Sequence, residues 1–334
     1  MSKFYDDLPV YDRLKYKIHA YYQTIWREKW VEDTDQIEEW LANFKDYQEG
    51  SDSNDKEKLN MLFLLSKFMY FGNKELRQLL ISLYRDLFKY PIVSKIRKEN
   101  NNSTDVKFLA DEYSQELERS RFLGVGNPSE SGVHMLYYFR QECKLSKDLF
   151  IDRSEIFSTK QINEITSVGL QSRRLVSSIN NRDIRRYVFI DDFCGSGSQA
   201  SGYLKELVEN IKFENELIEV NYLMVFGTEV GIQSIRNLKL FDKVEAVYTI
   251  DESFKTFSPT SRYFNEIPDG NIEKVFAQST AEKYGSRLFN PSLGYGDCQL
   301  LLGLFHNTPD NSLPIFWNNS SNWKPIFKRY NKIY

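Results

Sequence analysis

The chain has 334 residues, of which 41% are hydrophobic and 27% charged, a composition typical of a folded globular protein. A chain of this length has room for a helical module and an α/β domain. Its net charge of -3 at pH 7 excludes an overall basic field of the kind that drives non-specific binding to nucleic acid. Direct nucleic-acid binding is therefore not evident from the sequence.

Cysteine usage and hydropathy restrict the cellular setting. Cys143, Cys194 and Cys298 lie far apart and lack the spacing of metal ligands, which argues against a disulfide framework and a zinc site. The N-terminal segment carries acidic residues and has no apolar core of a signal peptide. No apolar run approaches the roughly 18 residues that cross a bilayer. We expect a cytoplasmic protein that does not contact membranes.

The first part of the chain has helical periodicity. Ile37, Trp40, Leu41 and Phe44 follow the spacing of one helix face, and leucines from Leu76 to Leu87 repeat it. The polar residues 45–58 between them predict a loop. We expect residues 1–100 to form an α-helical module that docks on the second domain or on a partner.

A domain boundary is predicted at residues 97–105, RKENNNSTD, which contain no hydrophobic residue. One further helix is expected over residues 105–120, and short apolar runs then alternate with helical stretches. This alternation predicts an α/β domain over residues 105–334 with a mostly parallel sheet and flanking helices. The expected strands are residues 121–126, 187–190, 220–226, 244–250 and 298–305.

Residues 187–199, YVFIDDFCGSGSQ, carry the strongest chemical signal. Four apolar residues predict a buried strand, and Asp191 and Asp192 follow at the carboxyl edge, where open α/β sheets bind ligands. A tight Gly/Ser turn then leads into a helix whose N-terminus favours an anion. The acidic pair suits ribose hydroxyls or a Mg²⁺ ion held through water. The predicted ribose-phosphate loop comprises Gly195, Ser196, Gly197, Ser198 and Gln199. The alternative is an ordinary strand-to-helix turn with a capping side chain.

Two further loops are candidate parts of the same pocket. Residues 121–132, RFLGVGNPSESG, predict a strand and a loop before a helix, and the alternative for this loop is a helix cap without a ligand. Residues 306–311, HNTPDN, follow an apolar run and are expected at the ligand edge of the same sheet. The alternative for this third loop is an Asx-rich turn that satisfies its own backbone. The residues expected to face a base or a metal-bound water are His306, Asn307, Asp310 and Asn311.

The strand, acidic pair and Gly/Ser loop resemble the ribose-phosphate motif of type I phosphoribosyltransferases. By this resemblance, Ser129, Ser131 and Gly132 form the pyrophosphate loop. Phe193, Cys194, Gly195 and Gln199 depart from the motif. The phrases IDDFCGSGSQ and HNTPDNSLPIFW together resemble the phosphoribosyltransferase-like domain of bacterial conflict systems, PRTase-CE, over about residues 105–325.

The resemblance implies an effector of a retron-like anti-phage system, with a reverse transcriptase and its RNA-DNA product as partners. The expected ligand is phosphoribosyl diphosphate or a nucleotide, with Mg²⁺ as cofactor. One hypothesis is an enzyme that transfers a phosphoribosyl group or cleaves an N-glycosidic bond, with Asp191 and Asp192 as its catalytic residues. The other is a non-catalytic sensor that regulates a partner, favoured by the departures from the motif and by the lack of an evident flexible catalytic hood.

Overall fold

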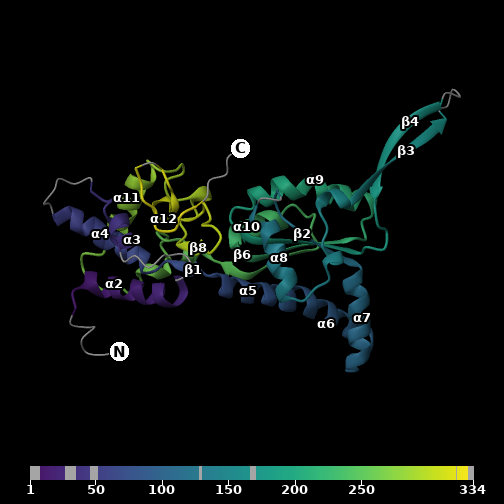
Figure 1. The fold of residues 1–334 in the computed structure, drawn as a ribbon, viewed down its shortest axis with the longest axis horizontal. Helices are drawn as coiled ribbons and strands as arrows, with labels where there is room; N and C mark the ends of the chain where they lie inside the picture. The colour runs from purple at the N-terminus through teal and green to yellow at the C-terminus, as the bar shows by residue number, and fades with distance from the viewer. Residues whose placement is uncertain are drawn as a thin grey trace. The chain divides into compact units, whose positions relative to one another are not determined.

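The computed structural model describes residues 8–26, 35–45, 52–127, 130–165, 171–320 and 322–329 (Figure 1). The chain forms two compact units. The first unit comprises Met1–Leu76 and Ile250–Tyr334, and the second comprises Arg77–Thr249. The predicted boundary at residues 97–105 lies inside the second unit, so the compact units differ from the predicted domains. The division into independently folding parts at that boundary stays a prediction.

A four-stranded sheet forms the centre of the second unit, in the order β2-β5-β6-β7. Strands β2, β5 and β6 are parallel, with Phe122 opposite Val188 and Phe189 opposite Tyr222. The four apolar runs predicted between residues 121 and 250 are these strands, so the predicted α/β architecture is confirmed. The strands are β2 (Ser120–Gly124), β5 (Arg186–Cys194), β6 (Glu219–Thr228) and β7 (Lys243–Ile250).

Helices cover both faces of this sheet because alternate strand residues point to opposite sides. On one face, Tyr187 and Phe189 of β5 share a buried core with α9 (Ser198–Glu214) and α10 (Glu229–Arg236), which Figure 1 shows on one side of the sheet. On the other face, Phe122 packs edge-on against Phe139 of α8 (Ser131–Glu142).

The helices that precede the sheet follow the predicted periodicity. Within the predicted boundary segment, one helix ends at Glu99 and the next begins at Val106, so residues 100–105 connect two helices of the second unit. Asp105 caps the second of these, accepting hydrogen bonds from the N–H groups of Lys107 and Phe108. These helices are α5 (Asn73–Ser82), the π-helix η2 (Leu83–Lys89), α6 (Tyr90–Glu99) and α7 (Val106–Glu118).

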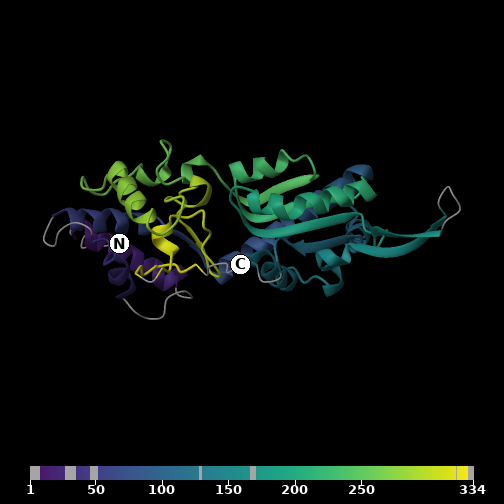
Figure 2. The same ribbon diagram turned by 90° about the horizontal axis from the view of Figure 1, so that it is seen from above.

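An antiparallel hairpin, β3 (Phe157–Ile165) and β4 (Gln171–Ile179), lies between α8 and β5 and extends from the sheet as an arm (Figures 1 and 2). The sequence did not predict it. Its strands, FSTKQINEI and QSRRLVSSI, are mostly polar, whereas the predicted strands were recognised as apolar runs. The two strands pair over nine residue positions, from Phe157 opposite Ile179 to Ile165 opposite Gln171.

The first unit is largely helical and contains a second parallel pair, β1 (Met69–Phe71) and β8 (Leu302–Leu304). The expectation that residues 298–305 join the main sheet is therefore wrong, because β8 pairs with β1. The predicted loop over residues 45–58 is also shorter than expected, since α4 begins at Asp52. The helices of this unit are α2 (Val10–Tyr21), the π-helix η1 (Tyr22–Trp26), α3 (Asp35–Leu41), α4 (Asp52–Leu65), α11 (Lys274–Gly285) and α12 (Pro314–Trp317).

In the part of the chain that the structure describes, no helix combines the length and apolar character required to span a membrane.

Candidate functional site

The acidic pair at the end of β5 divides between the two faces of the sheet. Asp191 Oδ2 accepts a hydrogen bond of 2.8 Å from the Tyr222 hydroxyl on β6. Asp192 Oδ1 accepts one of 2.9 Å from the Ser131 hydroxyl at the start of α8. Both carboxyl groups are buried, with 8% and 6% of each residue exposed. Adjacent strand residues point in opposite directions, so the two carboxylates have different neighbours.

The environment of Asp191 favours its neutral form. Burial raises the pKa of this carboxyl well above its usual range, and the neighbouring Asp192 charge acts in the same direction. The hydrogen bond from Tyr222 opposes this shift. Asp191 Oδ1 also accepts a bond of 3.0 Å from the backbone N–H of Asp192. Asp191 therefore positions the end of the strand, while Asp192 is the carboxylate held beside α8.

The Gly/Ser loop after β5 offers backbone donors to an anion. Gly197 adopts φ 79°, a left-handed conformation that only glycine adopts without strain, and α9 begins at the next residue. The Ser198 N–H donates to Ser196 Oγ over 3.3 Å. Among the described residues, no acceptor is found for the N–H groups of Ser196 and Gly197. Together with the positive end of the α9 dipole, these groups suit a phosphate.

A threonine that sequence reasoning missed supports this loop from the neighbouring strand. The Thr228 hydroxyl at the end of β6 donates to the Gly195 carbonyl over 2.5 Å. The same oxygen accepts a bond of 2.9 Å from the Gly231 N–H in the first turn of α10. A threonine between an apolar run and a helical stretch is a typical N-cap, so the cap was visible in the sequence. Its contact with Gly195 was not.

The loop between β2 and α8 approaches the Gly/Ser loop through Glu130. Its Oε2 accepts from Gln199 Nε2 over 3.1 Å and from the Asn127 N–H over 3.3 Å. Ser131 and Gly132 open α8, and Ser131 contacts Asp192. The predicted Ser129 lies outside the described residues. The structure thus brings together the first two predicted motifs, and Glu130 is a member that the sequence did not indicate.

The third predicted loop lies in the first unit, and its polar groups bond within that unit. Asn307 Oδ1 accepts from the Thr308 N–H, and Asp310 forms an ion pair of 3.1 Å with Arg329. Asn311 is buried and donates to the Tyr295 carbonyl. Of these three contacts, the Asn307 bond lies within the turn, whereas Asp310 and Asn311 bond to residues outside it. The assignment of His306, Asn307, Asp310 and Asn311 to a base or metal-water site stays a prediction.

Within the described ranges, side chains of the protein do not form a metal site by themselves. No group of three or more His, Cys, Asp or Glu side chains is placed there to hold an ion. Asp191 is bonded to Tyr222 and Asp192 to Ser131, and the assignment of the pair to a water-held Mg²⁺ stays a prediction. The oxygen of Asp192 still has the chemistry that Mg²⁺ prefers, provided that water or ligand oxygens complete its coordination.

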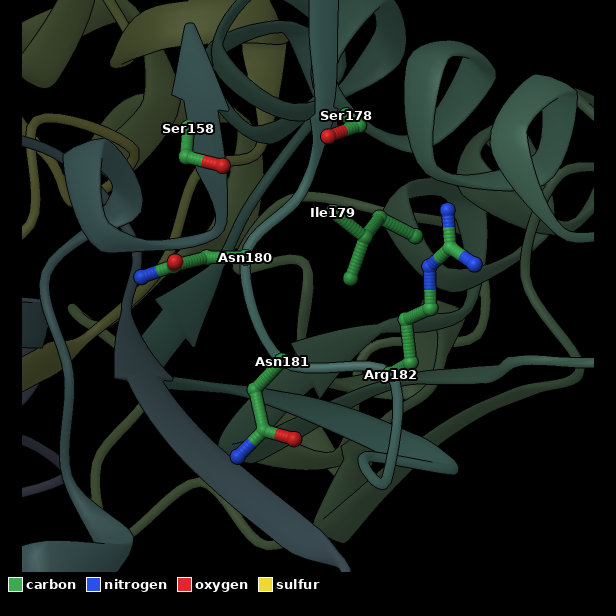
Figure 3. Close-up of a pocket in the computed structure, with 6 residues that line it drawn as sticks. All are labelled: Ser158, Ser178, Ile179, Asn180, Asn181 and Arg182. Carbon is green, nitrogen blue, oxygen red and sulfur yellow. The ribbon is translucent and has the colours of Figure 1, made fainter. Parts of the chain in front are cut away.

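A separate polar pocket of about 620 Å³ lies at the base of the hairpin (Figure 3). Asn180 to Arg182 of its lining precede β5, whereas the Gly/Ser loop follows β5, so the nine residues of that strand separate the two places. None of the predicted site residues lines this pocket. Its lining residues are Ser158, Ser178, Ile179, Asn180, Asn181 and Arg182.

The fold is that of an α/β protein with a parallel sheet and a strand, acidic pair and Gly/Ser loop at its carboxyl edge. A model of the PRTase-CE family matches residues 37–329, and the chain belongs to this family. The family assignment made from the two sequence phrases is therefore confirmed. A search of curated proteins found no match.

Solved structures that are similar to parts of this chain include three from bacteria and archaea. A hypothetical protein from Neisseria gonorrhoeae with bound ppGpp is 11% identical, with a TM-score of 0.25, and the match covers 55% of this chain and 85% of that one. Orotate phosphoribosyltransferase from Aeropyrum pernix is 15% identical over 42% and 73% of the two chains, with a TM-score of 0.23. Xanthine-guanine-hypoxanthine phosphoribosyltransferase from Helicobacter pylori is 6% identical over 55% and 87%, with a TM-score of 0.25.

Proposed function

We propose that the second unit binds a 5′-phosphorylated ribose at the carboxyl edge of its sheet and that this ligand is the substrate of a glycosyl-transfer reaction. The observation that carries the proposal is the joint placement of the Gly/Ser loop and Asp192. The loop supplies backbone N–H groups at a helix N-terminus, and Asp192 supplies a carboxylate. A phosphate requires the first and sugar hydroxyls require the second.

The different contacts of the two acidic residues support separate roles for them in this proposal. Asp192 accepts hydrogen bonds from ribose hydroxyls and stabilises positive charge as it develops on the sugar. Asp191, bonded to Tyr222 and to the Asp192 N–H, holds the end of β5 in place. The 5′-phosphate binds the Ser196 and Gly197 N–H groups, and the hydroxyls of Ser196 and Ser198 add further donors.

Magnesium belongs to this proposal as a ligand-associated ion. Asp192 would hold it, with water and phosphate oxygens of the ligand completing the coordination. When bound, the ion neutralises phosphate charge. Among the residues of this chain, the Gly/Ser loop anchors the 5′-phosphate whether or not the ion is present.

Calorimetric titration tests the proposal. Wild type is titrated with ribose 5-phosphate and with phosphoribosyl diphosphate, each with and without Mg²⁺. Asp192→Asn keeps an oxygen for Ser131 but removes the charge, and we expect it to weaken binding roughly 10- to 100-fold. Asp183→Asn, an exposed carboxylate in the turn before β5, is the matched control and leaves affinity unchanged. No heat from wild type with either ligand at millimolar concentration would refute the proposal.

Gly197→Ala is a second variant, placed in the phosphate loop. A Cβ at this position would lie 3.0 Å from the Gly231 carbonyl, and φ 79° strains any L side chain. We expect roughly tenfold weaker binding of ribose 5-phosphate, because the loop N–H groups shift. Circular dichroism of the variant should match wild type, which would separate a local change from unfolding.

The sensor remains the second candidate, favoured by the departures of Gly195 and Gln199 from the phosphoribosyltransferase motif. Labelled ligand incubated with protein and cell extract separates the two. Label that moves to a base, a nucleotide or RNA supports an enzyme, and label that stays on the bound ligand supports a sensor.

We also propose a cytoplasmic effector role in a retron-like anti-phage system, which membership of the PRTase-CE family supports at the level of the family alone. The proposed partner is a reverse transcriptase with its RNA-DNA product. Co-purification with the products of neighbouring genes tests this, and recovery only as a free monomer would count against it.

A further inference from the structure

Glu130 places a carboxylate in the loop that the sequence resemblance assigns to a pyrophosphate. It lies in the loop between β2 and α8, on the approach to the Gly/Ser loop. The carboxylate takes the Asn127 N–H, over 3.3 Å, and the Gln199 side-chain amide on the first turn of α9, over 3.1 Å. These two N–H donors could bind an anionic group of a ligand, but they are already hydrogen-bonded to a carboxylate of the protein.

The backbone of the loop is shaped around this carboxylate. Gly126 adopts φ 103°, and a Cβ built on it would lie 2.0 Å from Glu130 Oε2. Glycine is the residue that both tolerates this conformation and leaves room for the carboxylate. The Glu130 N–H in turn donates to the Asn127 carbonyl over 2.8 Å, so two hydrogen bonds join Asn127 and Glu130.

We propose that Glu130 is a specificity-determining residue that selects ligands with a single 5′-phosphate on the ribose and disfavours ligands with a 1-pyrophosphate. This inference rests on the proposed function, because it assigns the ligand class of the same site. Two anions a few ångströms apart in a partly buried loop repel each other by several times RT. A ribose 5-phosphate or a nucleoside 5′-monophosphate leaves this position free of a second anion. Such a nucleotide suits cleavage of an N-glycosidic bond better than transfer from a diphosphate donor.

Glu130→Gln is the informative variant. It keeps an oxygen that accepts from Asn127 and Gln199 but removes the charge, so a purely structural role of Glu130 would leave ligand preference unchanged. Glu155→Gln is the matched control. Glu155 accepts from the N–H of Asp152, also three residues before it, and lies in the same unit.

The measured quantity is the ratio of the dissociation constants of phosphoribosyl diphosphate and ribose 5-phosphate, obtained by calorimetry with and without Mg²⁺. We expect wild type to bind the diphosphate no more tightly than ribose 5-phosphate. Glu130→Gln should strengthen diphosphate binding about tenfold or more and change ribose 5-phosphate binding by less than about twofold. Glu155→Gln should leave both constants unchanged.

Two results would overturn the inference while leaving the proposed function intact. One is an unchanged ratio in Glu130→Gln when both ligands bind. The other is weaker binding of the Mg²⁺ diphosphate by the variant, which would show that Glu130 helps to hold the ion. Failure of both wild type and variant to bind either ligand would instead refute the proposed function, and the inference with it.

Discussion

Two polar loops that follow apolar strands differ in what their polar groups do. In the second unit, the Ser196 and Gly197 N–H groups have no acceptor among the described residues, and Asp192 is bonded to Ser131 at the start of α8. In the first unit, the side chains of Asp310 and Asn311 are bonded to Arg329 and to the Tyr295 carbonyl. Polar residue types at a strand end are therefore a weak sign of a ligand site. Donors left available by the fold are a stronger one.

The same contrast explains why the two loops are built from different residues. The loop after β5 contains glycine and serine, whose backbones can approach a ligand closely. The loop after β8 contains asparagine, aspartate and proline, which fix a turn through side-chain bonds to the backbone. The first composition leaves main-chain donors available, and the second uses its side chains within the turn. We therefore expect substitutions to change ligand binding in the first loop and stability in the second.

Asn311→Ala should produce the largest effect on stability. Asn311 is 5% exposed and its side-chain amide donates to the Tyr295 carbonyl over 3.0 Å and to Cys298 Sγ over 3.3 Å, so the variant removes both bonds and leaves a small cavity. We expect the free energy of unfolding of the first unit to fall by about 2 kcal/mol. All five tryptophans of the chain lie within the first unit, so tryptophan fluorescence during denaturant titration reports on this unit.

Ligand affinity of Asn311→Ala should stay within about twofold of wild type. Asn319→Ala, an exposed asparagine in the same unit, is the control that changes neither quantity. Weakened ribose 5-phosphate binding with unchanged stability would place the 306–311 loop in the ligand site and remove the contrast between the two loops.

Asp191→Asn tests whether the first acid of the pair is structural, through the pH dependence of stability. The pKa of Asp191 is raised by burial, so the stability that the carboxyl contributes is complete below its usual pKa and is lost as pH rises toward its folded-state pKa. Asparagine does not titrate. The variant should therefore gain stability relative to wild type from pH 4 upward, by at most about 1.4 kcal/mol per pH unit.

Amide hydrogen exchange in β5 and β6 measures this difference in the second unit. Asp152→Asn is a control whose effect on stability should depend on pH in the opposite direction. The Ser154 backbone N–H lowers the pKa of the Asp152 carboxyl. The stability that Asp152 contributes is present above its usual pKa and is lost as pH falls. If Asp191→Asn shows no pH-dependent gain, Asp191 is ionised in the folded protein and can bind a ligand as Asp192 does.

Local patterns in the sequence were sufficient to predict the elements around β5. An apolar run, an acidic pair and a Gly/Ser turn are encoded by neighbouring residues, and each was found where expected. The parity of a strand also implies that Asp191 and Asp192 point to opposite faces. Which face receives which carboxyl depends on Tyr222, which lies 31 residues beyond Asp191 in the chain. No local pattern carries that information.

The missed features have the same origin. The pairing of β8 with β1 joins residues more than 200 positions apart, and an apolar run does not specify its partner. The hairpin strands consist mostly of polar residues, so no apolar run in the sequence indicated them. Glu130 looked like an ordinary loop residue, and only its distance to Gln199 gives it a role. Long-range pairing and side-chain approach therefore required the structure.

Asp310→Asn should have the smallest effect. Its ion pair with Arg329 is partly exposed, and pairs of this kind stabilise proteins by about 0.5 kcal/mol. Arg329 keeps its bond to the Thr308 carbonyl, so the turn should persist. Tryptophan-monitored unfolding at low and high salt, in a double-mutant cycle with Arg329→Gln, isolates the pair energy, which should vanish at high salt. A loss of ribose 5-phosphate binding in Asp310→Asn, larger than its loss of stability, would instead make this carboxylate part of the site.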